Sequence, residues 1–386
     1  MNTWLLRPGE LTLKGGNRKS FENVLKRNLL RMLKTKAEVI ITKGRFYVNC
    51  KDEDCEVTEK ALSHLMGIAG LARTVTCEKT PGAVLRACVD EAKKIYEQGV
   101  KTYKIEARRT DKSFPMDSYQ LKVEGGNAIR DAISGLKVDI HNPECTICVE
   151  IREKAFIYSG LKKGLGGLPV GTAGRGLLLL SGGIDSPVAG FMMASRGMGI
   201  DAVHFHAYPY TSLEARQKVI DLANILGSYC MGIRLFIIGF TAVQKRIKER
   251  APENWLTVLL RMAMLEASEK AAYKIKSKCL ISGESLSQVA SQTIENLTCI
   301  QSRTKLPILR PLIGMDKISI IGKARQLNTY ETSILPYEDC CILFSPPHPV
   351  LCGNPAEAAR LYEELDISPL IDEALKTREI VKCGFY

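Results

Sequence analysis

The chain contains no apolar run long enough to cross a bilayer, and its first residues show no signal-peptide pattern. These absences predict a cytosolic protein that has no membrane partner. A disulfide framework is also missing, because the 13 cysteines are odd in number and scattered along the 386 residues. Such usage fits reduced thiols, as expected in the cytosol.

Two common nucleotide-binding patterns are absent. The sequence has neither the Gly-x-x-x-x-Gly-Lys-Ser/Thr of a Walker loop nor the Gly-x-Gly-x-x-Gly of a dinucleotide fold. Instead, four leucines at 177–180 predict a strand buried on both faces, and Ser-Gly-Gly-Ile-Asp-Ser-Pro follows at 181–187. The glycines permit a tight turn, and the proline suits the first turn of a helix. A strand, a glycine turn and a helix N-terminus together predict a phosphate site.

Basic charge is concentrated in the first half of the chain. Residues 1–175 carry a net charge of +10, whereas residues 176–386 carry +2. This asymmetry indicates that the first half meets a polyanion, most simply a nucleic acid. A solvated basic face is the alternative.

One stretch of the first half combines basic residues with an aromatic. Residues 104–115 end a predicted strand in a basic loop that carries Phe114, and this combination can hold phosphates and stack a base. We expect the RNA contacts at six basic residues: Lys14, Arg18, Lys104, Arg108, Arg109 and Lys112.

Cys145 and Cys148 have the spacing of a metal-binding pair. In a strand, however, two residues at this spacing point to opposite faces, and no second pair lies nearby. We therefore expect no metal site of cysteine and histidine ligands.

The pattern of elements divides the chain into four parts. Residues 1–57 and 58–165 read as two small α/β units, and 166–176 as a glycine-rich linker. Residues 177–386 alternate strands and helices, as a parallel sheet requires. Because ligands of such sheets bind at the carboxyl ends of the strands, the loops that follow them should converge.

The predicted phosphate loop contains a carboxylate that needs an explanation. Asp185 would repel a phosphate unless it serves a magnesium ion or fixes the loop, and both roles are favoured over helix capping. Ser181 and Ser186 offer hydroxyls to phosphate oxygens. His204 and His206 share one face of a strand, and a packed wall near the nucleotide is favoured over a metal site that lacks a third ligand.

Three later features could complete the site. The stretch 282–296 follows another buried strand and should face the first loop across the sheet. Lys317 begins a helix, where a cation is unfavourable unless an anion lies beside it; a plain surface lysine is the alternative. Cys340 and Cys341 lie in a loop between prolines, where a thiol is available for attack.

Together these motifs resemble the tRNA 4-thiouridine synthetases of the ThiI family, over almost the whole chain. The resemblance implies an N-terminal ferredoxin-like domain (1–57), a THUMP RNA-binding domain (58–165) and a doubly wound parallel-sheet PP-loop ATP pyrophosphatase domain (177–386). It further implies that the protein makes 4-thiouridine at uridine 8 of tRNA with ATP and magnesium. The family commonly acts as a homodimer in which one tRNA touches both subunits.

The resemblance also implies roles for single residues. Asp185 matches the family's PP-loop aspartate, Lys317 its adenylation lysine and Cys340 its sulfur-transfer cysteine, with Cys341 as the alternative. The family's ATP contacts fall on Leu179, Leu180, His204, Phe205, Arg261, Gly283 and Gln292. The turn residues Ser181, Gly182, Gly183 and Ser186 complete the ATP site that we predict.

The chain departs from many relatives in its length. Those relatives continue into a rhodanese domain that carries a persulfide, whereas this sequence stops at Tyr386. We therefore expect a short form that receives sulfur from a cysteine desulfurase, directly or through a small carrier. A role in thiamine synthesis, tied to the rhodanese part, is not expected.

Two other functions stay open. A PP-loop ligase that forms amides would use the same adenylation, but it leaves the basic first half unexplained and no glutaminase-like segment is present. A non-catalytic RNA-binding protein with a relic nucleotide fold should have lost Asp185, Lys317 or Cys340, and all three are present.

Overall fold

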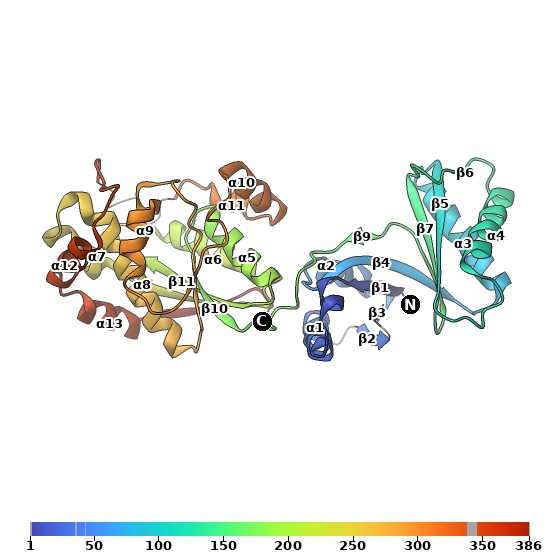
Figure 1. Cartoon of the computed structure of the whole chain (residues 1–386), viewed down its shortest axis with the longest axis horizontal. Coiled ribbons are helices and arrows are strands. Elements are labelled where there is room, and N and C mark those ends of the chain that lie inside the picture. The colour runs from blue at the N-terminus through green and yellow to red at the C-terminus, as the bar shows by residue number, and fades with distance from the viewer. Residues whose placement is uncertain (1, 35–36, 43, 338–345, 386) are drawn as a thin grey trace. The chain divides into compact units, whose positions relative to one another are not determined.

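The computed structural model describes residues 2–34, 37–42, 44–337 and 346–385. The chain divides into two compact units, Met1–Gly167 and Leu168–Tyr386 (Figure 1). Within the described ranges, none of the helices has the length and apolar character needed to cross a membrane.

The first unit is built on one mixed sheet with the strand order β2-β3-β1-β4-β8-β7-β5-β6, and β9 pairs separately with β4. Its elements are β1 (Asn2–Pro8), α1 (Arg18–Leu33), β2 (Ala37–Thr42), β3 (Arg45–Cys50), α2 (Cys55–Ser63), β4 (Ile68–Cys77), α3 (Pro81–Glu97), β5 (Thr102–Arg109), α4 (Ser118–Ala132), β6 (Lys137–Val138), β7 (Cys145–Ile151), β8 (Ala155–Tyr158) and β9 (Lys162–Lys163).

Strand β4 belongs to both halves of this sheet. Its residues up to Thr74 pair antiparallel with β1, and those from Val75 to Cys77 pair antiparallel with β8. Figure 1 shows β4 as a long strand that runs from β1 to the β5–β7 side of the unit. One strand therefore connects the half around α1 and α2 to the half around α3 and α4.

The sequence predicts most of these elements but misses β9, and two features of the half around α3 and α4 differ from the prediction. We predict a helix over 126–134, but α4 begins at Ser118, because Asp117 and Gln120 form a capping box that starts the helix earlier. The loop after β5 does not present its aromatic to a ligand. Phe114 is 4% exposed and packs in the core with Val84 and Tyr103, so the prediction that it stacks a base is wrong.

The second unit has a six-stranded sheet with the order β14-β13-β10-β11-β12-β15. Its elements are β10 (Arg175–Leu179), α5 (Asp185–Ser195), β11 (Gly199–His206), α6 (Leu213–Tyr229), β12 (Ile233–Gly239), α7 (Thr241–Arg250), α8 (Leu256–Lys274), β13 (Leu280–Ile281), α9 (Ile294–Gln301), β14 (Ile308–Leu309), α10 (Lys317–Gln326), α11 (Tyr330–Ser333), α12 (Pro355–Glu364), α13 (Ser368–Lys376) and β15 (Glu379–Cys383).

The parallel sheet expected from the sequence is confirmed for five of these strands, since β10 pairs parallel with β11 and β13, β11 with β12, and β13 with β14. Strand β15 is the exception, because it closes the edge antiparallel to β12. The leucine run lies at the centre, where Leu177 and Leu178 are fully buried. Helix α8 is buried nearly all round, as expected for a helix between a sheet and further helices.

The glycine-rich stretch before β10 packs on the second unit. The N–H of Leu168 donates to the carbonyl of Ser195 (2.9 Å), and the N–H groups of Gly171 and Ala173 both donate to the carbonyl of Gly197 (2.8 and 3.0 Å). These bonds tie residues 168–173 to the end of α5.

Candidate active site

The glycine turn after β10 is held by its own serines. The N–H of Ser181 donates to Oγ of Ser186 (3.0 Å), and the N–H of Gly183 donates to Oγ of Ser181 (3.2 Å). Helix α5 begins two residues after Gly183. The turn therefore stands against a helix N-terminus, the arrangement that favours a bound anion.

A second loop approaches this turn closely, as the sequence predicts. A Cβ atom added to Gly283 would lie 2.8 Å from both the Cα and the N of Ser186. Because both atoms belong to the backbone, no side chain could move to make room. Glycine is therefore required at 283 for the loops after β10 and β13 to meet.

The two loops border a cavity of about 340 Å³ at the carboxyl ends of the strands. Nine of the eleven predicted ATP contacts line it: Leu179, Leu180, Ser181, Ser186, His204, Phe205, Arg261, Gly283 and Gln292. Gly182 and Gly183 are not among the lining residues, although they belong to the same turn. The structure thus gathers side chains from several strand ends and from helices α5 and α8 into a single concave site.

Asp185 and Lys317 form an ion pair at this cavity. Nζ of Lys317 lies 2.6 Å from Oδ1 of Asp185, and Nε2 of Gln288 donates to Oδ2 (2.9 Å). Lys317 is the first residue of α10, and the anion that lies beside it in the structure is the Asp185 carboxylate. Asp185 is also not the residue that caps α5, since Ile184 holds that position.

A buried carboxylate in the lining of the cavity holds two arginines. Glu284 is 3% exposed, and it accepts from Nη2 of Arg261 and from Nε of Arg310, each at 2.7 Å. Burial acts to raise the pKa of Glu284, but the two guanidiniums lower it below its ordinary value. Glu284 therefore remains a carboxylate that orients Arg261 in the cavity wall.

Both histidines are buried, and His204 lines the cavity whereas His206 is not among its lining residues. His204 and His206 are 6% and 8% exposed; Nδ1 of His204 lies 3.1 Å from the carbonyl of Leu180, and Nε2 of His206 lies 3.3 Å from that of Ser212. Burial lowers the pKa of His206 below its ordinary value, which keeps this ring neutral.

Gln292 brings an unsatisfied acceptor to the cavity. It is 9% exposed, and its buried Oε1 has no hydrogen-bond partner among the described residues. A buried acceptor of this kind is costly unless a bound molecule donates to it.

The described part of the chain holds no cluster of three or more histidine, cysteine or acidic side chains that could bind a metal.

Cys340 and Cys341 lie outside the described residues. The described chain before them ends at Tyr337, and it is anchored by the buried Lys218 on α6. Nζ of Lys218 donates to the carbonyl oxygens of Leu335 (3.1 Å) and Tyr337 (2.7 Å).

The six predicted RNA contacts all lie in the first unit, but in different settings. Lys104 and Arg108 line a cavity of about 480 Å³ together with Arg7, and Lys112 is exposed. Arg109 is half-buried, and its Nη1 donates to the carbonyls of Phe114 (2.9 Å) and Met116 (3.3 Å), so it holds the loop.

The two N-terminal members of this set lie near α1. Nζ of Lys14 lies 5.2 Å from the ring centre of Phe21, and Nε of Arg18 pairs with Glu22 (2.8 Å). Both side chains are partly exposed.

Several lining residues of the second-unit cavity escape the sequence argument. They are Val203, Met264, Ser282, Glu284, Gln288 and Val289. Glu284 and Gln288 belong to the stretch 282–296, so their neighbourhood is expected although their partners are not. Arg310 is missed too, because nothing local indicates that it pairs with Glu284.

Comparisons with known proteins find matches to both units of the chain. A family model described as thiamine biosynthesis protein (ThiI) matches residues 171–367, a ThiI ferredoxin-like domain model matches residues 3–72, and a THUMP domain model matches residues 79–159.

Two relatives are similar over nearly the whole chain. A probable tRNA sulfurtransferase of Treponema pallidum (strain Nichols) is 47% identical over 380 residues, which cover 97% of this chain and 94% of the relative. A probable tRNA sulfurtransferase of Caldanaerobacter subterraneus subsp. tengcongensis is 44% identical over 370 residues, or 95% and 96% of the two chains. The crystal structure of a 4-thiouridine synthetase–RNA complex with bound ATP matches with a TM-score of 0.92 and 34% identity, covering 100% of both chains.

Proposed function

Because the chain belongs to the ThiI family of tRNA sulfurtransferases, we propose that it uses ATP to convert uridine 8 of tRNA into 4-thiouridine. The observation that carries the proposal is the pairing of Asp185 with Lys317 beside the glycine turn of the second unit. A relic nucleotide fold would have no reason to keep a lysine and a carboxylate paired beside this glycine turn.

The first step is adenylation of the uracil. The C4 oxygen attacks the α-phosphate of ATP, a new oxygen–phosphorus bond forms, and pyrophosphate leaves with the bonding electrons. The N-terminus of α5, beside the glycine turn, attracts the leaving pyrophosphate, and Lys317 neutralises charge that develops on the phosphates.

Magnesium would supply further positive charge to the phosphates. Asp185 is the carboxylate placed to hold it, together with phosphate oxygens and water, which suits an ion that seldom takes all its ligands from protein. Lys317 occupies one oxygen of this carboxylate, so the other oxygen, bonded to Gln288, is the one that a metal would take over.

The second step replaces the activated oxygen by sulfur. A persulfide on Cys340 attacks C4 through its terminal sulfur and AMP leaves, which joins C4 to Cys340 through two sulfurs. A second thiol then attacks the Cys340 sulfur, so that two cysteines are oxidised to a disulfide and the nucleobase keeps the reduced sulfur. Alternatively, the persulfide is first reduced by a thiol and releases sulfide, which makes the attack. A cysteine desulfurase supplies the sulfane sulfur.

The first unit binds the tRNA. Lys14, Arg18, Lys104, Arg108 and Lys112 offer cations to the phosphate backbone, and Arg109 shapes the loop that carries Lys112. Uridine 8 must leave its stacked position to enter the cavity, which costs roughly a few kcal/mol. Contacts elsewhere on the tRNA offset this cost.

A homodimer would let one subunit bind the tRNA while the other carries out the chemistry.

The test is mass spectrometry of nucleosides from unmodified tRNA incubated with the protein, Mg-ATP and either a persulfide or free sulfide. We expect 4-thiouridine from both sources with the wild type. Cys340→Ala should lose the product with persulfide and keep it with sulfide, whereas the neighbouring Cys341→Ala should keep both. If ATP is turned over to AMP and pyrophosphate without any thiolated nucleoside, the acceptor is not uridine and a ligase function replaces the proposed one.

A further inference from the structure

The two halves of the first unit meet at one place along β4. Thr74 is the last residue paired with β1, and Val75 is the first paired with β8. Thr74 is 6% exposed, and its hydroxyl donates to the carbonyl of Ile157 on β8 (3.0 Å). A strand shared in this way can bend where its pairing partner changes, between Thr74 and Val75, and we call this place the junction. The angle between the two halves therefore depends on side chains that cross the junction.

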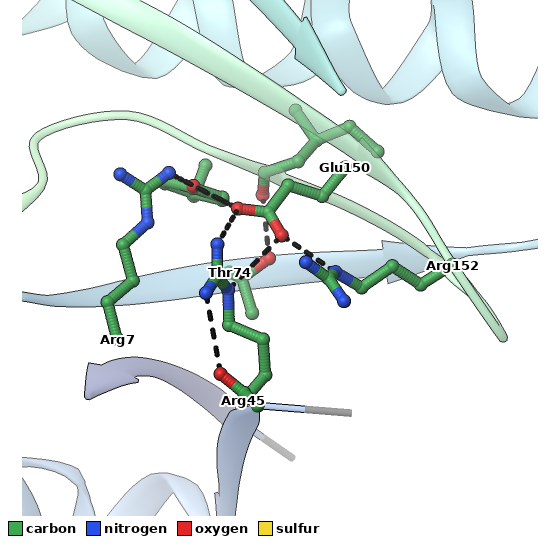
Figure 2. A network of polar contacts seen from close by, with 8 residues as sticks. Arg7, Arg45, Thr74, Glu150 and Arg152 are labelled. Carbon is green, nitrogen blue, oxygen red and sulfur yellow. Dashed lines mark hydrogen bonds and ion pairs between the residues drawn. The ribbon is translucent and has the colours of Figure 1, made fainter. Parts of the chain in front are cut away.

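Glu150 on β7 is the principal side chain of this kind. Its carboxylate accepts from Nη2 of Arg7 on β1 (3.2 Å) and from Nη2 of Arg45 on β3 (3.4 Å). From its own half it accepts from Nε of Arg152 (2.8 Å) and from the hydroxyl of Tyr158 (2.9 Å). Figure 2 shows the three guanidiniums converging on this one carboxylate from both sides of β4.

The environment makes this carboxylate difficult to replace. Glu150 is 1% exposed, and burial acts to raise its pKa, but Arg45, Arg152 and Tyr158 lower the pKa to about 2. Without the carboxylate, three cations would face one another at a buried site. Removing one member of such a cluster leaves unpaired buried charge, which costs far more than losing a surface pair.

A stacked aromatic pair crosses the same junction. The rings of Tyr47 on β3 and Phe156 on β8 lie 4.5 Å apart at an angle of 16°, and both are buried. The apolar contact adds stability, but it fixes direction less strictly than hydrogen bonds to a carboxylate do.

The junction also controls where basic residues lie. Arg7, held by Glu150 and by the Tyr158 hydroxyl, lines the same cavity as Lys104 and Arg108 of β5. The network therefore brings a cation from the N-terminal half beside two cations of the other half. Lys14 and Arg18 belong to the N-terminal half as well, so their distance from Lys104 depends on the same angle.

We propose that Glu150 is a positioning residue for tRNA: it fixes the angle between the two halves of the first unit so that their basic residues fit one RNA. The inference rests on the proposed tRNA sulfurtransferase function. It extends that function by naming a buried acidic residue, which would not itself touch RNA, as a determinant of RNA affinity.

The test compares two neutralising variants of the full-length protein. Glu150→Gln and Glu124→Gln each remove one negative charge from the first unit, but Glu124 is exposed on α4. By charge alone both variants should bind tRNA as well as the wild type or better. The proposal instead predicts that Glu150→Gln raises KM for tRNA at least about tenfold, with kcat and KM for ATP unchanged. Glu124→Gln should leave all three constants unchanged.

If Glu150→Gln matches Glu124→Gln in KM for tRNA, the proposal is overturned. Should Glu150→Gln fail to fold, Glu150→Asp decides, because it keeps the charge and withdraws the carboxylate by one methylene. A raised KM for tRNA in this variant supports the proposal, and a wild-type value overturns it.

A failure of the proposed function is recognised separately. If the wild type makes no 4-thiouridine, the proposed tRNA thiolation is wrong. The structural role of Glu150 is then tested without RNA, by measuring amide hydrogen exchange at residues 74–77 and 155–157 on the two sides of the junction. Faster exchange in the Glu150 variant than in the Glu124 variant would support the structural part of the inference, and equal exchange would refute it.

Discussion

Glu150 in the first unit and Glu284 in the second are both buried carboxylates held by arginines, and the two clusters differ in what surrounds them. Glu150 joins strands from two halves of a sheet, and three guanidiniums meet it. Glu284 lies beside the cavity that contains Asp185, and two guanidiniums meet it. Both carboxylates are buried and paired with guanidiniums, so their different roles follow from where they lie. In our proposals Glu150 fixes the shape of a binding surface, and Glu284 orients Arg261 in a reaction site.

This contrast predicts that the effect of a substitution depends on the unit in which it lies. Changes around Glu284 and the glycine turn should alter the ATP steps and leave tRNA affinity unchanged, whereas changes around Glu150 should do the reverse. The following experiments could break that division.

The largest effect is expected for Lys317→Ala. Loss of the ammonium removes the cation that stabilises charge in the adenylation step, so the rate of pyrophosphate release should fall about 1000-fold. The dissociation constant for tRNA, measured by filter binding, should stay at the wild-type value. Lys305→Ala, an exposed lysine of the same unit, is the control. A weakened tRNA complex in Lys317→Ala alone would show that the second unit also determines RNA affinity.

The next effect concerns pH and the first unit. The folded-state pKa of Glu150 is about 2, below the ordinary value of 4.5, so its contribution to stability is complete above pH 4.5 and is lost as the pH falls towards 2. The free energy of unfolding should fall by about 3 kcal/mol over this pH range through Glu150. In Glu150→Gln this part of the acid-induced loss of stability should be absent.

Fluorescence can follow the first unit alone. The chain has two tryptophans, Trp4 in the first unit and Trp255 in the second, so a Trp255→Phe background leaves Trp4 as the reporter. If unfolding follows the same pH profile with and without Glu150→Gln in this background, the role given to the carboxylate is contradicted.

Glu284→Gln should act on ATP. Neutralising the carboxylate leaves Arg261 and Arg310 with a weaker partner, so ATP should bind about tenfold more weakly. Isothermal titration with a non-hydrolysable ATP analogue measures this, and tRNA binding serves as the internal control. Equal ATP affinity would mean that Arg261 holds its position without Glu284.

The smallest effect is expected for Gly283→Ala. The added methyl group would press on the backbone of Ser186 and separate the two loops, which should raise KM for ATP by about threefold to tenfold. Gly314→Ala is a matched control, because an added Cβ there meets no atom within 4 Å. Equal KM values for ATP in the two variants would show that the two loops can separate without weakening ATP binding.

The sequence was sufficient for much of the fold because periodic patterns are local. The leucines of β10, the glycine turn and α5 follow one another within about 20 residues, and each is recognisable from its neighbours. The start of α4 was missed although Asp117 and Gln120 carry a capping-box pattern. Helices α9, α11, α12 and α13, the antiparallel β15 and the two-residue strands β9 and β14 were not predicted.

The candidate site was predictable where motifs mark it and not where contacts are distant. Asp185 and Lys317 are 132 residues apart, and each was singled out locally, Asp185 as a carboxylate in the predicted phosphate loop and Lys317 as a cation at a helix start. Glu150 gives no such signal. Its partners Arg7 and Arg45 lie 143 and 105 residues away, and only the folded sheet brings them together.

Pyrophosphate release without any sulfur source tests the central claim most directly, because it isolates adenylation of the tRNA from the later chemistry. The wild type should release pyrophosphate from Mg-ATP with unmodified tRNA, and should release none with the same tRNA carrying cytidine at position 8 or without tRNA. Equal release in all three reactions would contradict the account, because ATP would then be cleaved without uridine 8 as the acceptor.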